Sequence, residues 1–462
     1  MNTRDLVVSL LLLLAWVCLP AVQAEEESDR EPILYRQSTP RNAISALQAR
    51  IDTGEVTLAY DEQFGYLPSV LKALGISVDS QMLVYSKTSL QLRRITPRTP
   101  RAIYFNDDLY VGYCHAGDVL EVSAVDPQLG TVFYILSQQA EEKPQFMRQL
   151  DNCLVCHSSS RTEGVPGHLV RSLYVDAGGQ PLLAAGSRTV DHTTPIAKRW
   201  GGWYVSGTHG SQSHLGNLMI RGNRVVEPVD NASGHNVTDL GNRFHVGSYL
   251  TPHSDLVALM ILEHQVLVHN RLTKANFTTR QALAYDQMMR KVLERGGDEP
   301  LESTTRRIRD AGEDLVEALL LVEEAPLTEP IAGTSGFTAR FNAQGPRDDQ
   351  GRSLRQLDLQ KRLLAYPCSY LIYSPAFRGL PEPMKAYVWR RLQAILTGSE
   401  PEPRFAHLSS ADRAAIWQIL SQTHPDLLKG KKGSEPESGS GPAGAVLGSR
   451  LPPSSGRGQP SD

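Results

Sequence analysis

The sequence has few cysteines, no excess of either charge and no hydrophobic run of membrane-spanning length. Five cysteines in 462 residues are too few to build a disulfide scaffold. The 47 Lys and Arg residues against 50 Asp and Glu residues give a formal net charge of -3, which argues against a nucleic-acid partner. With 40% hydrophobic residues, the chain is too apolar for a disordered polyelectrolyte. At about 100–200 residues a domain, its length predicts two to four domains.

The hydrophobic run Leu6–Val17 predicts a cleaved export signal. It is shorter than the ~20 residues that cross a bilayer. Val22-Gln23-Ala24, with small residues at both positions that a signal peptidase reads, follows it. We therefore expect residues 1–24 to be removed, leaving a periplasmic or otherwise exported protein without a membrane span. The alternative, a lipid anchor at Cys18, is disfavoured because bulky residues precede that cysteine.

The other end of the chain, residues 430–462, predicts a disordered tail. Gly, Ser and Pro occupy 20 of its 33 positions, so it has almost nothing to bury.

The region between the two ends predicts an α+β fold. Short β-branched or aromatic runs separated by turn residues predict an antiparallel sheet of about five strands, at 82–85, 102–105, 109–113, 119–122 and 132–136, after short helices at 44–47 and 67–74. Residues 169–185 predict a hairpin, with 173–175 and 181–183 on either side of Ala177-Gly178-Gly179.

From Thr251 the sequence becomes mainly helical. Thr251-Pro252 predicts the start of a helix, and Leu256 to Leu262 are apolar on every side, which predicts that this helix is buried. Further helices are predicted from a capping box at Thr278, over 303–323, 353–364 and 384–396, and from Ser409, with a loop at 333–351.

Residues 153–157 read Cys-Leu-Val-Cys-His, the C-x-x-C-H pattern of a c-type haem attachment site. Two thiols three residues apart on a helical turn can each form a thioether with one vinyl group of a porphyrin, and the next imidazole then reaches the iron. With 5 Cys and 13 His, chance predicts about 0.0015 occurrences. We therefore predict one covalent haem c, attached to Cys153 and Cys156 and ligated by His157.

Other chemistry remains open for these thiols. A zinc site could use Cys114, Cys153, Cys156 and Cys368, although a zinc ribbon normally has a second C-x-x-C. A dithiol redox centre normally lies in a βαβ setting, which the flanking residues do not predict. Cys114 and Cys368 could also form a disulfide or stay buried thiols.

With its flanking residues, the motif resembles bacterial exported c-type cytochromes, specifically uncharacterised single-haem proteins with a cytochrome c domain. The resemblance rests on residues 153–157 and 161–168, is supported by 101–108 and 200–210, and covers about 100–265. It implies haem on the two cysteines, iron on His157, and electron transfer with redox partner proteins. Small all-α cytochromes c continue with helices and a methionine loop, whereas this chain continues with loops and a hairpin, so their ordinary fold is not expected here.

The second iron ligand is less defined. His209, in a glycine-rich loop, is the leading candidate for the metal site, and the alternatives are an open site or Met219, His214, Met260 or His264. Arg161, Arg171 and Arg199 are candidate partners for the haem propionates.

These observations predict five segments after the signal: an α+β sheet module (25–145), a haem-attachment region (146–250), two helical regions (251–326 and 327–429) and the tail. An electron carrier is the leading hypothesis. A haem enzyme, peroxidase-like or dehydrogenase-like with an open iron site, is the alternative, because the 438 residues left after signal removal exceed what one haem needs. A zinc or dithiol protein is the third.

Overall fold

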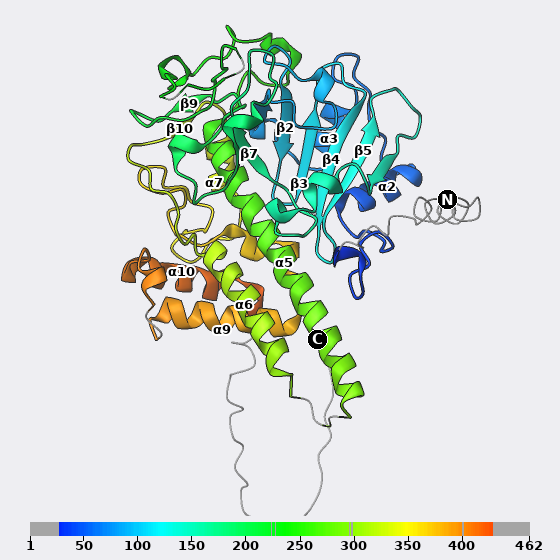
Figure 1. Ribbon diagram of the computed structural model, residues 1–462, viewed down its shortest axis with the longest axis vertical. Coiled ribbons are helices and arrows are strands. Elements are labelled where there is room, and N and C mark those ends of the chain that lie inside the picture. The colour runs from blue at the N-terminus through cyan, green and yellow to red at the C-terminus, as the bar shows by residue number, and fades with distance from the viewer. Residues whose placement is uncertain are drawn as a thin grey trace, which may run out of the picture.

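The computed structural model describes residues 27–222, 224–226, 228–294, 296, 299–399 and 402–427. The predicted signal (1–24) and tail (430–462) lie outside these residues. The described chain is α+β as predicted, with an antiparallel sheet in the N-terminal half and mainly helices in the C-terminal half (Figure 1). None of the described helices combines the length and hydropathy needed to cross a membrane.

The sheet has six strands, each antiparallel to the next in chain order: β1 (Met82–Val84), β2 (Arg101–Phe105), β3 (Leu109–Tyr113), β4 (Val119–Asp126), β5 (Gly130–Ser137) and β6 (Phe146–Gln149). The five predicted strands are present, and β6 extends the sheet beyond residue 145. The helices α2 (Ala43–Asp52) and α3 (Leu67–Ala73) share one buried apolar cluster with the sheet. They contribute the buried side chains of Ile44, Leu47, Ile51, Leu67, Val70 and Leu71.

The helix α5 (Leu256–Val292) is 37 residues long and connects the two halves of the molecule. The carboxylate of Asp255 accepts hydrogen bonds from the first-turn N–H groups, so the helix begins at Leu256 and the predicted start at Thr251 is wrong. Residues 256–262 are all buried, as predicted. The predicted new helix at Thr278 is also wrong, because α5 continues unbroken and the Thr279 hydroxyl donates to Ala275 one turn back.

The other long helices lie beside the lower part of α5 in Figure 1: α6 (Glu302–Leu319), α9 (Glu382–Thr397) and α10 (Ser410–Thr423). The predicted loop at 333–351 contains α7 (Phe337–Ala343), and α8 (Pro375–Arg378) follows later. The predicted helix at 353–364 is wrong. This segment folds back on itself through a bridge between Leu357 and Leu364, with Leu359 at a positive φ of 56°.

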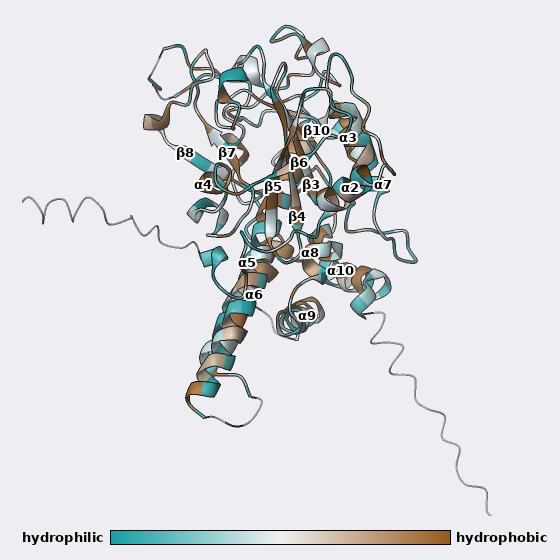
Figure 2. Cartoon of the chain, turned by 90° about the vertical axis from the view of Figure 1, so that its right-hand side faces the viewer, coloured by the Kyte–Doolittle hydropathy of each residue, from teal (hydrophilic) through white to brown (hydrophobic). Residues whose placement is uncertain are grey.

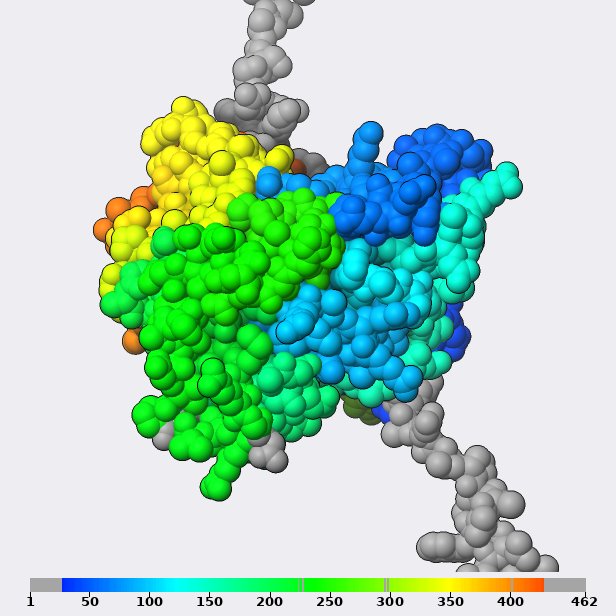
Figure 3. Space-filling view, turned by 90° about the horizontal axis from the view of Figure 1, so that it is seen from above, coloured from blue at the N-terminus to red at the C-terminus, as the bar shows by residue number. Residues whose placement is uncertain are grey.

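The segment between the sheet and α5 is mostly loops. Its strands β7 (Val170–Leu173) and β8 (Ser187–Val190) pair with each other, so β7 lies within the predicted hairpin (169–185) and β8 lies beyond its end. The predicted arms 173–175 and 181–183 keep one bridge, between Val175 and Pro181. A further pair joins β9 (Gly207–Thr208) to β10 (Ala332–Gly333). Trp203 bridges to Val84 at the edge of the sheet. Figure 3 shows this green segment lying directly against the blue N-terminal part.

Candidate haem-attachment site

The C-x-x-C-H motif forms one helical turn, α4 (Leu154–His157), with Cys153 at its start. Leu154 is buried and anchors the turn in the apolar cluster of the sheet, whereas Val155 is 77% exposed. Cys156 is exposed and Cys153 is half-buried. Figure 2 labels α4 on the same side of the molecule as β7 and β8. Leu154 therefore anchors the turn in the fold, with the Cys156 thiol at the surface and Cys153 packed partly against the apolar cluster.

His157 is held by a backbone carbonyl. Its ring Nδ1 lies 2.9 Å from the carbonyl oxygen of Gly167. Because a carbonyl only accepts, Nδ1 must carry the proton, and the lone pair is left on Nε2. Burial lowers the pKa of His157, which favours the neutral imidazole. A neutral imidazole with a hydrogen-bonded Nδ1 and a free Nε2 is the form that binds a metal.

The Gly167 carbonyl is itself positioned from two sides. The Thr131 N–H in β5 donates to the Pro166 carbonyl at 2.9 Å. From α5, the Asn270 side chain accepts from the His168 N–H at 3.2 Å and donates to the His168 carbonyl at 2.8 Å. A Cβ on Gly167 would lie 2.2 Å from Asn270 Oδ1, so the approach requires glycine. Sheet and helix together thus aim this carbonyl at His157.

A second histidine lies beside the first. His168 is buried, with Nε2 2.8 Å from Ser123 Oγ and Nδ1 3.2 Å from Thr131 Oγ1. Its ring centroid is 6.4 Å from that of His157, and Phe133 contacts both rings, at 4.8 and 5.8 Å. Burial holds the pKa of His168 well below its usual range, so this imidazole is neutral. His168 therefore forms an uncharged wall beside His157.

The cysteines do not have the properties of a dithiol or a zinc site. Burial raises the pKa of Cys153 to about 11, whereas reactive C-x-x-C thiols have a lowered pKa. Cys114 and Cys368 are buried free thiols and form no disulfide. Among the described residues, which include all four of these cysteines, no group of three His, Cys, Asp or Glu side chains is placed to hold a metal ion. The Cys₄ zinc arrangement is therefore not assembled.

His209 belongs to another histidine group. Its ring centroid lies 4.6 Å from His214 and 5.5 Å from His235. Its Nε2 accepts from the Asn236 N–H at 3.0 Å, while its Nδ1 is buried without a hydrogen-bond partner. None of its described hydrogen bonds or ring contacts involves the attachment turn, which is formed by residues 153–157. The structure therefore does not bring His209 into contact with His157, and its coordination of iron stays a prediction.

The remaining candidate ligands are placed as follows. Both ring nitrogens of His264 are engaged, Nδ1 at 3.0 Å from His192 Nδ1 and Nε2 at 2.8 Å from Ser369 Oγ. Met260 is buried in the helical core. Met219 lies in irregular chain.

The candidate propionate partners separate into two kinds. Arg199 is only 2% exposed, and its guanidinium lies 2.8 Å from Glu263 on α5, so it is committed inside the fold. Arg171 on β7 donates a hydrogen bond to the Ser187 hydroxyl. Burial and the positive charge of Arg161 lower the pKa of Arg171, and the nearby Cys156 thiol raises it. Arg161 and Arg171 are thus near the thiols, and Arg199 is not available.

Gly167, His168 and Asn270 were not identified from the sequence as functional residues. The first two lie only ten and eleven residues beyond His157, in a stretch that carried the resemblance, so a local signal existed. Asn270 is 102 residues away from His168 and has no such signal.

Comparisons with protein families, with curated proteins and with solved structures found no match for this chain. The functional argument therefore rests on the geometry of the attachment turn and its supports.

Proposed function

We propose that this chain is an exported bacterial c-type cytochrome. It carries one covalent haem on Cys153 and Cys156, with His157 on the iron, and exchanges single electrons with redox partner proteins. The observation that supports the proposal is the hydrogen bond from His157 Nδ1 to the Gly167 carbonyl, in a turn that also carries one exposed and one half-buried thiol. When bound, haem supplies one-electron redox chemistry.

The residues of the turn and its supporting loop have separate roles in the proposed site. Leu154 anchors the helix, the two cysteines anchor the porphyrin, and Gly167 fixes which nitrogen of His157 is available. The exposed Cys156 suits a haem whose edge stays within reach of another protein, as single-electron exchange requires. Export rests on the predicted signal at 1–24, and it is consistent with haem attachment outside the cytoplasmic membrane.

The test is expression of the chain with a cytochrome c maturation system. We expect haem to stay with the polypeptide on denaturing electrophoresis and to give a c-type pyridine haemochrome spectrum. Replacing both Cys153 and Cys156 by Ala should abolish covalent haem, whereas replacing Cys114 and Cys368 by Ala should not. Wild-type protein without covalent haem would refute the proposal.

A haem oxidoreductase is the second candidate, favoured by a continuous series of aromatic contacts that leads inward from His157. Ring centroids of His157, His168 and Tyr110 follow one another at 6.4 and 4.0 Å. A low-spin six-coordinate spectrum that cyanide and peroxide leave unchanged would contradict the enzyme. A high-spin ferric form that reacts with peroxide would contradict a simple carrier.

A further inference from the structure

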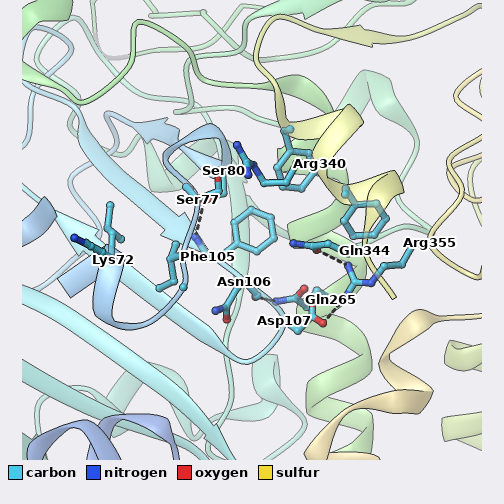
Figure 4. A pocket seen from close by; sticks show the side chains of 15 residues that line it. Lys72, Ser77, Ser80, Phe105, Asn106, Asp107, Gln265, Arg340, Gln344 and Arg355 are labelled. Atoms are coloured by element: carbon cyan, nitrogen blue, oxygen red, sulfur yellow. Dashed lines mark hydrogen bonds and ion pairs between the residues drawn. The ribbon is translucent and has the colours of Figure 1, made fainter. Parts of the chain in front are cut away.

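A pocket of about 370 Å³ lies where α3, α5 and α7 meet (Figure 4). Its lining includes the cations Lys72, Arg340 and Arg355 and the carboxylate of Asp107. Arg340 already pairs with Asp79, and Arg355 pairs with Asp107, so both arginines are engaged within the protein. The lining therefore selects no particular ligand, whereas the end of α5 presents a surface that does.

The C-terminal end of α5 carries an exposed apolar stripe. Tyr285, Met288 and Val292 follow one another at spacings of three and four residues, which places them on one face of the helix, and Leu293 lies beside them. These four residues, the α5 stripe, are 44%, 53%, 69% and 53% exposed, respectively. In Figures 1 and 2 this end of α5 projects beyond the sheet, and Figure 2 shows hydrophobic (brown) residues on it.

The neighbouring helix α6 leaves the α5 stripe uncovered. It packs against another side of α5, where the Thr304 hydroxyl donates to the Asp286 carboxylate at 3.0 Å. Asp286 lies about 100° around the helix from Tyr285. A helix that buries one side in its own fold and exposes contiguous apolar side chains on another offers a contact site for a protein or a membrane.

The size of the stripe distinguishes between these two partners. Interfaces that hold two proteins together bury at least about 1,000 Å² and use about 20–30 residues on each side, whereas the stripe has four. A bilayer requires no matching partner surface, because apolar side chains need only enter the boundary between headgroups and acyl chains. Tyrosine is enriched at that depth. The stripe therefore suits lipid better than a second copy of the chain.

The N-terminal end of the described chain lies on the same helix. The Gln281 amide, one turn before Tyr285, donates to the Glu27 carbonyl at 3.4 Å. The run Leu6–Val17, which the sequence predicts to be an export signal, ends ten residues before Glu27. Ten residues span at most about 36 Å. Leu293 lies only about 18 Å along the helix from Gln281. A signal in the membrane would thus bring the α5 stripe within reach of the same bilayer.

The charges beside the stripe are balanced. Residues 286–310, the end of α5 and the start of α6, contain six Lys and Arg residues against six Asp and Glu residues. Arg290 pairs with Asp286 at 2.6 Å, and Lys291 is exposed next to Val292. A lysine can keep its amine in the headgroup layer while its apolar neighbours enter the bilayer. Binding should therefore come from apolar burial and depend little on lipid charge or salt.

We propose that the α5 stripe binds the surface of a phospholipid bilayer, with its four side chains in the boundary between headgroups and acyl chains. The contact lies on the membrane and does not cross it. This inference goes beyond the proposed function and does not depend on haem, so haem content and membrane binding are judged by separate measurements.

The experiment measures flotation of the exported protein, residues 25–462, with vesicles of neutral phosphatidylcholine and with vesicles that also contain anionic phosphatidylglycerol. We expect reversible binding to both, changed less than about twofold by lipid charge or salt. Met288→Glu combined with Val292→Glu should weaken binding about tenfold or more, because two apolar contacts are lost. Leu90→Glu combined with Leu92→Glu is the matched control, since both leucines are 46% exposed between β1 and β2, and it should bind like the wild type.

The outcomes separate the possible occupants of the stripe. Absence of wild-type binding to both kinds of vesicle, or equal binding by the two double variants, would overturn the proposal. Binding to anionic vesicles alone that high salt abolishes would replace insertion of the stripe by a charge contact. Sedimentation equilibrium without lipid should show a monomer. A dimer that Met288→Glu with Val292→Glu dissociates would assign the stripe to a second copy of the chain and also overturn the proposal. Circular dichroism checks that both double variants are folded.

Discussion

Two hydrogen bonds join His157 and Gly167. The ring Nδ1 of His157 lies 2.9 Å from the Gly167 carbonyl, and the Gly167 N–H donates to the His157 carbonyl at 2.8 Å. The loop that leaves the attachment turn therefore returns to fix the ring of its last residue. Orientation of a metal-binding histidine by such a partner also sets its basicity.

Replacing Asn270 tests whether α5 affects His157, the proposed iron ligand. Asn270→Ala removes both bonds to the His168 backbone, and we expect the free energy of unfolding to fall by about 2 kcal/mol because buried groups lose their partners. A less firmly held carbonyl makes His157 a weaker electron donor, so the midpoint potential should rise. Urea denaturation and a redox titration measure the two effects.

Asn276→Ala is the matched control on the same helix. Its amide donates to Pro127 and Gly379, both at 3.1 Å, and has no bond to the loop at 166–168. We expect a similar loss of stability with an unchanged midpoint potential. Equal changes in potential in the Asn270 and Asn276 variants would show that α5 has no specific effect on His157.

Gly167→Ala should disturb the site by overpacking. The added Cβ would lie 2.2 Å from Asn270 Oδ1, so the loop or α5 must shift, at a cost of about 1–3 kcal/mol in the free energy of unfolding. In Gly178→Ala the Cβ comes no closer than 3.3 Å to the end of the Asp176 side chain, and little change is expected. Thermal unfolding compares the two. A Gly167→Ala protein as stable as Gly178→Ala would contradict the close packing.

The sheet could be predicted from the sequence because its signals are local. Alternating β-branched and aromatic residues end at turn residues such as Asn106, whose side chain accepts from the N–H groups of Asp108 and Leu109. The helix errors have a different origin. The capping pattern at Thr278 occurs inside a helix whose length is set by packing, and the segment at 353–364 looks helical but is fixed by Leu359 at a positive φ.

The attachment turn could be predicted for the same local reason, because all its residues lie within one helical turn. The residues that hold the turn in place could not be predicted from the sequence. Asn270 reaches His168 only after α5 has packed on the sheet, and no spacing in the sequence reports that contact. The sequence suggested Arg199 as a propionate partner, but in the fold its guanidinium pairs with the carboxylate of Glu263, 64 residues later. Periodicity identifies which residues are buried and leaves their partners undefined.

The buried pair of Arg199 and Glu263 should matter for stability and not for haem. Arg199→Met leaves the Glu263 carboxylate unpaired at 0% exposure, so we expect the free energy of unfolding to fall by about 3–5 kcal/mol. Replacing both residues by Met should recover most of the loss. Haem attachment should be unchanged in each variant that folds. Urea denaturation measures the free energy of unfolding of each variant. A double variant as unstable as Arg199→Met would contradict the pairing.

Arg171→Met should have the opposite effects: little change in the free energy of unfolding and a change in the midpoint potential. Arg171 is half-buried near Cys156 and forms no ion pair among the described residues, so its loss should change the free energy of unfolding by less than about 1 kcal/mol. If haem binds as proposed, removal of a positive charge near it favours the ferric state, and the midpoint potential should fall. A redox titration beside that of Arg199→Met tests this, because a pure packing role for Arg171 would leave the potential unchanged.

Buried histidines should make the protein sensitive to acid. Burial lowers the pKa of His192 to about 3, of His269 to about 4 and of His214 to about 2, and it holds the pKa of His168 and of His264 well below the usual range, whereas unfolded histidine titrates near ~6.5. Below ~6.5 the unfolded chain therefore binds more protons, and stability falls as the pH falls. Three carboxylates oppose this, because burial raises the pKa of each to about 7 and the folded state then holds their protons: Asp108, Glu263 and Glu324.

The two effects act over different pH ranges, which gives the prediction its shape. Between ~6.5 and ~4.5 the three carboxylates offset three of the five histidines, so about two protons are left and stability should fall by about 2–3 kcal/mol per pH unit. Below ~4 the carboxylates become protonated in both states and no longer offset the histidines, so the loss per pH unit should become steeper. Urea denaturation from pH 7 to 3.5 should therefore show a moderate slope followed by a steeper one. A single slope from pH 6.5 downward would mean that the three carboxylates are not protonated in the folded protein.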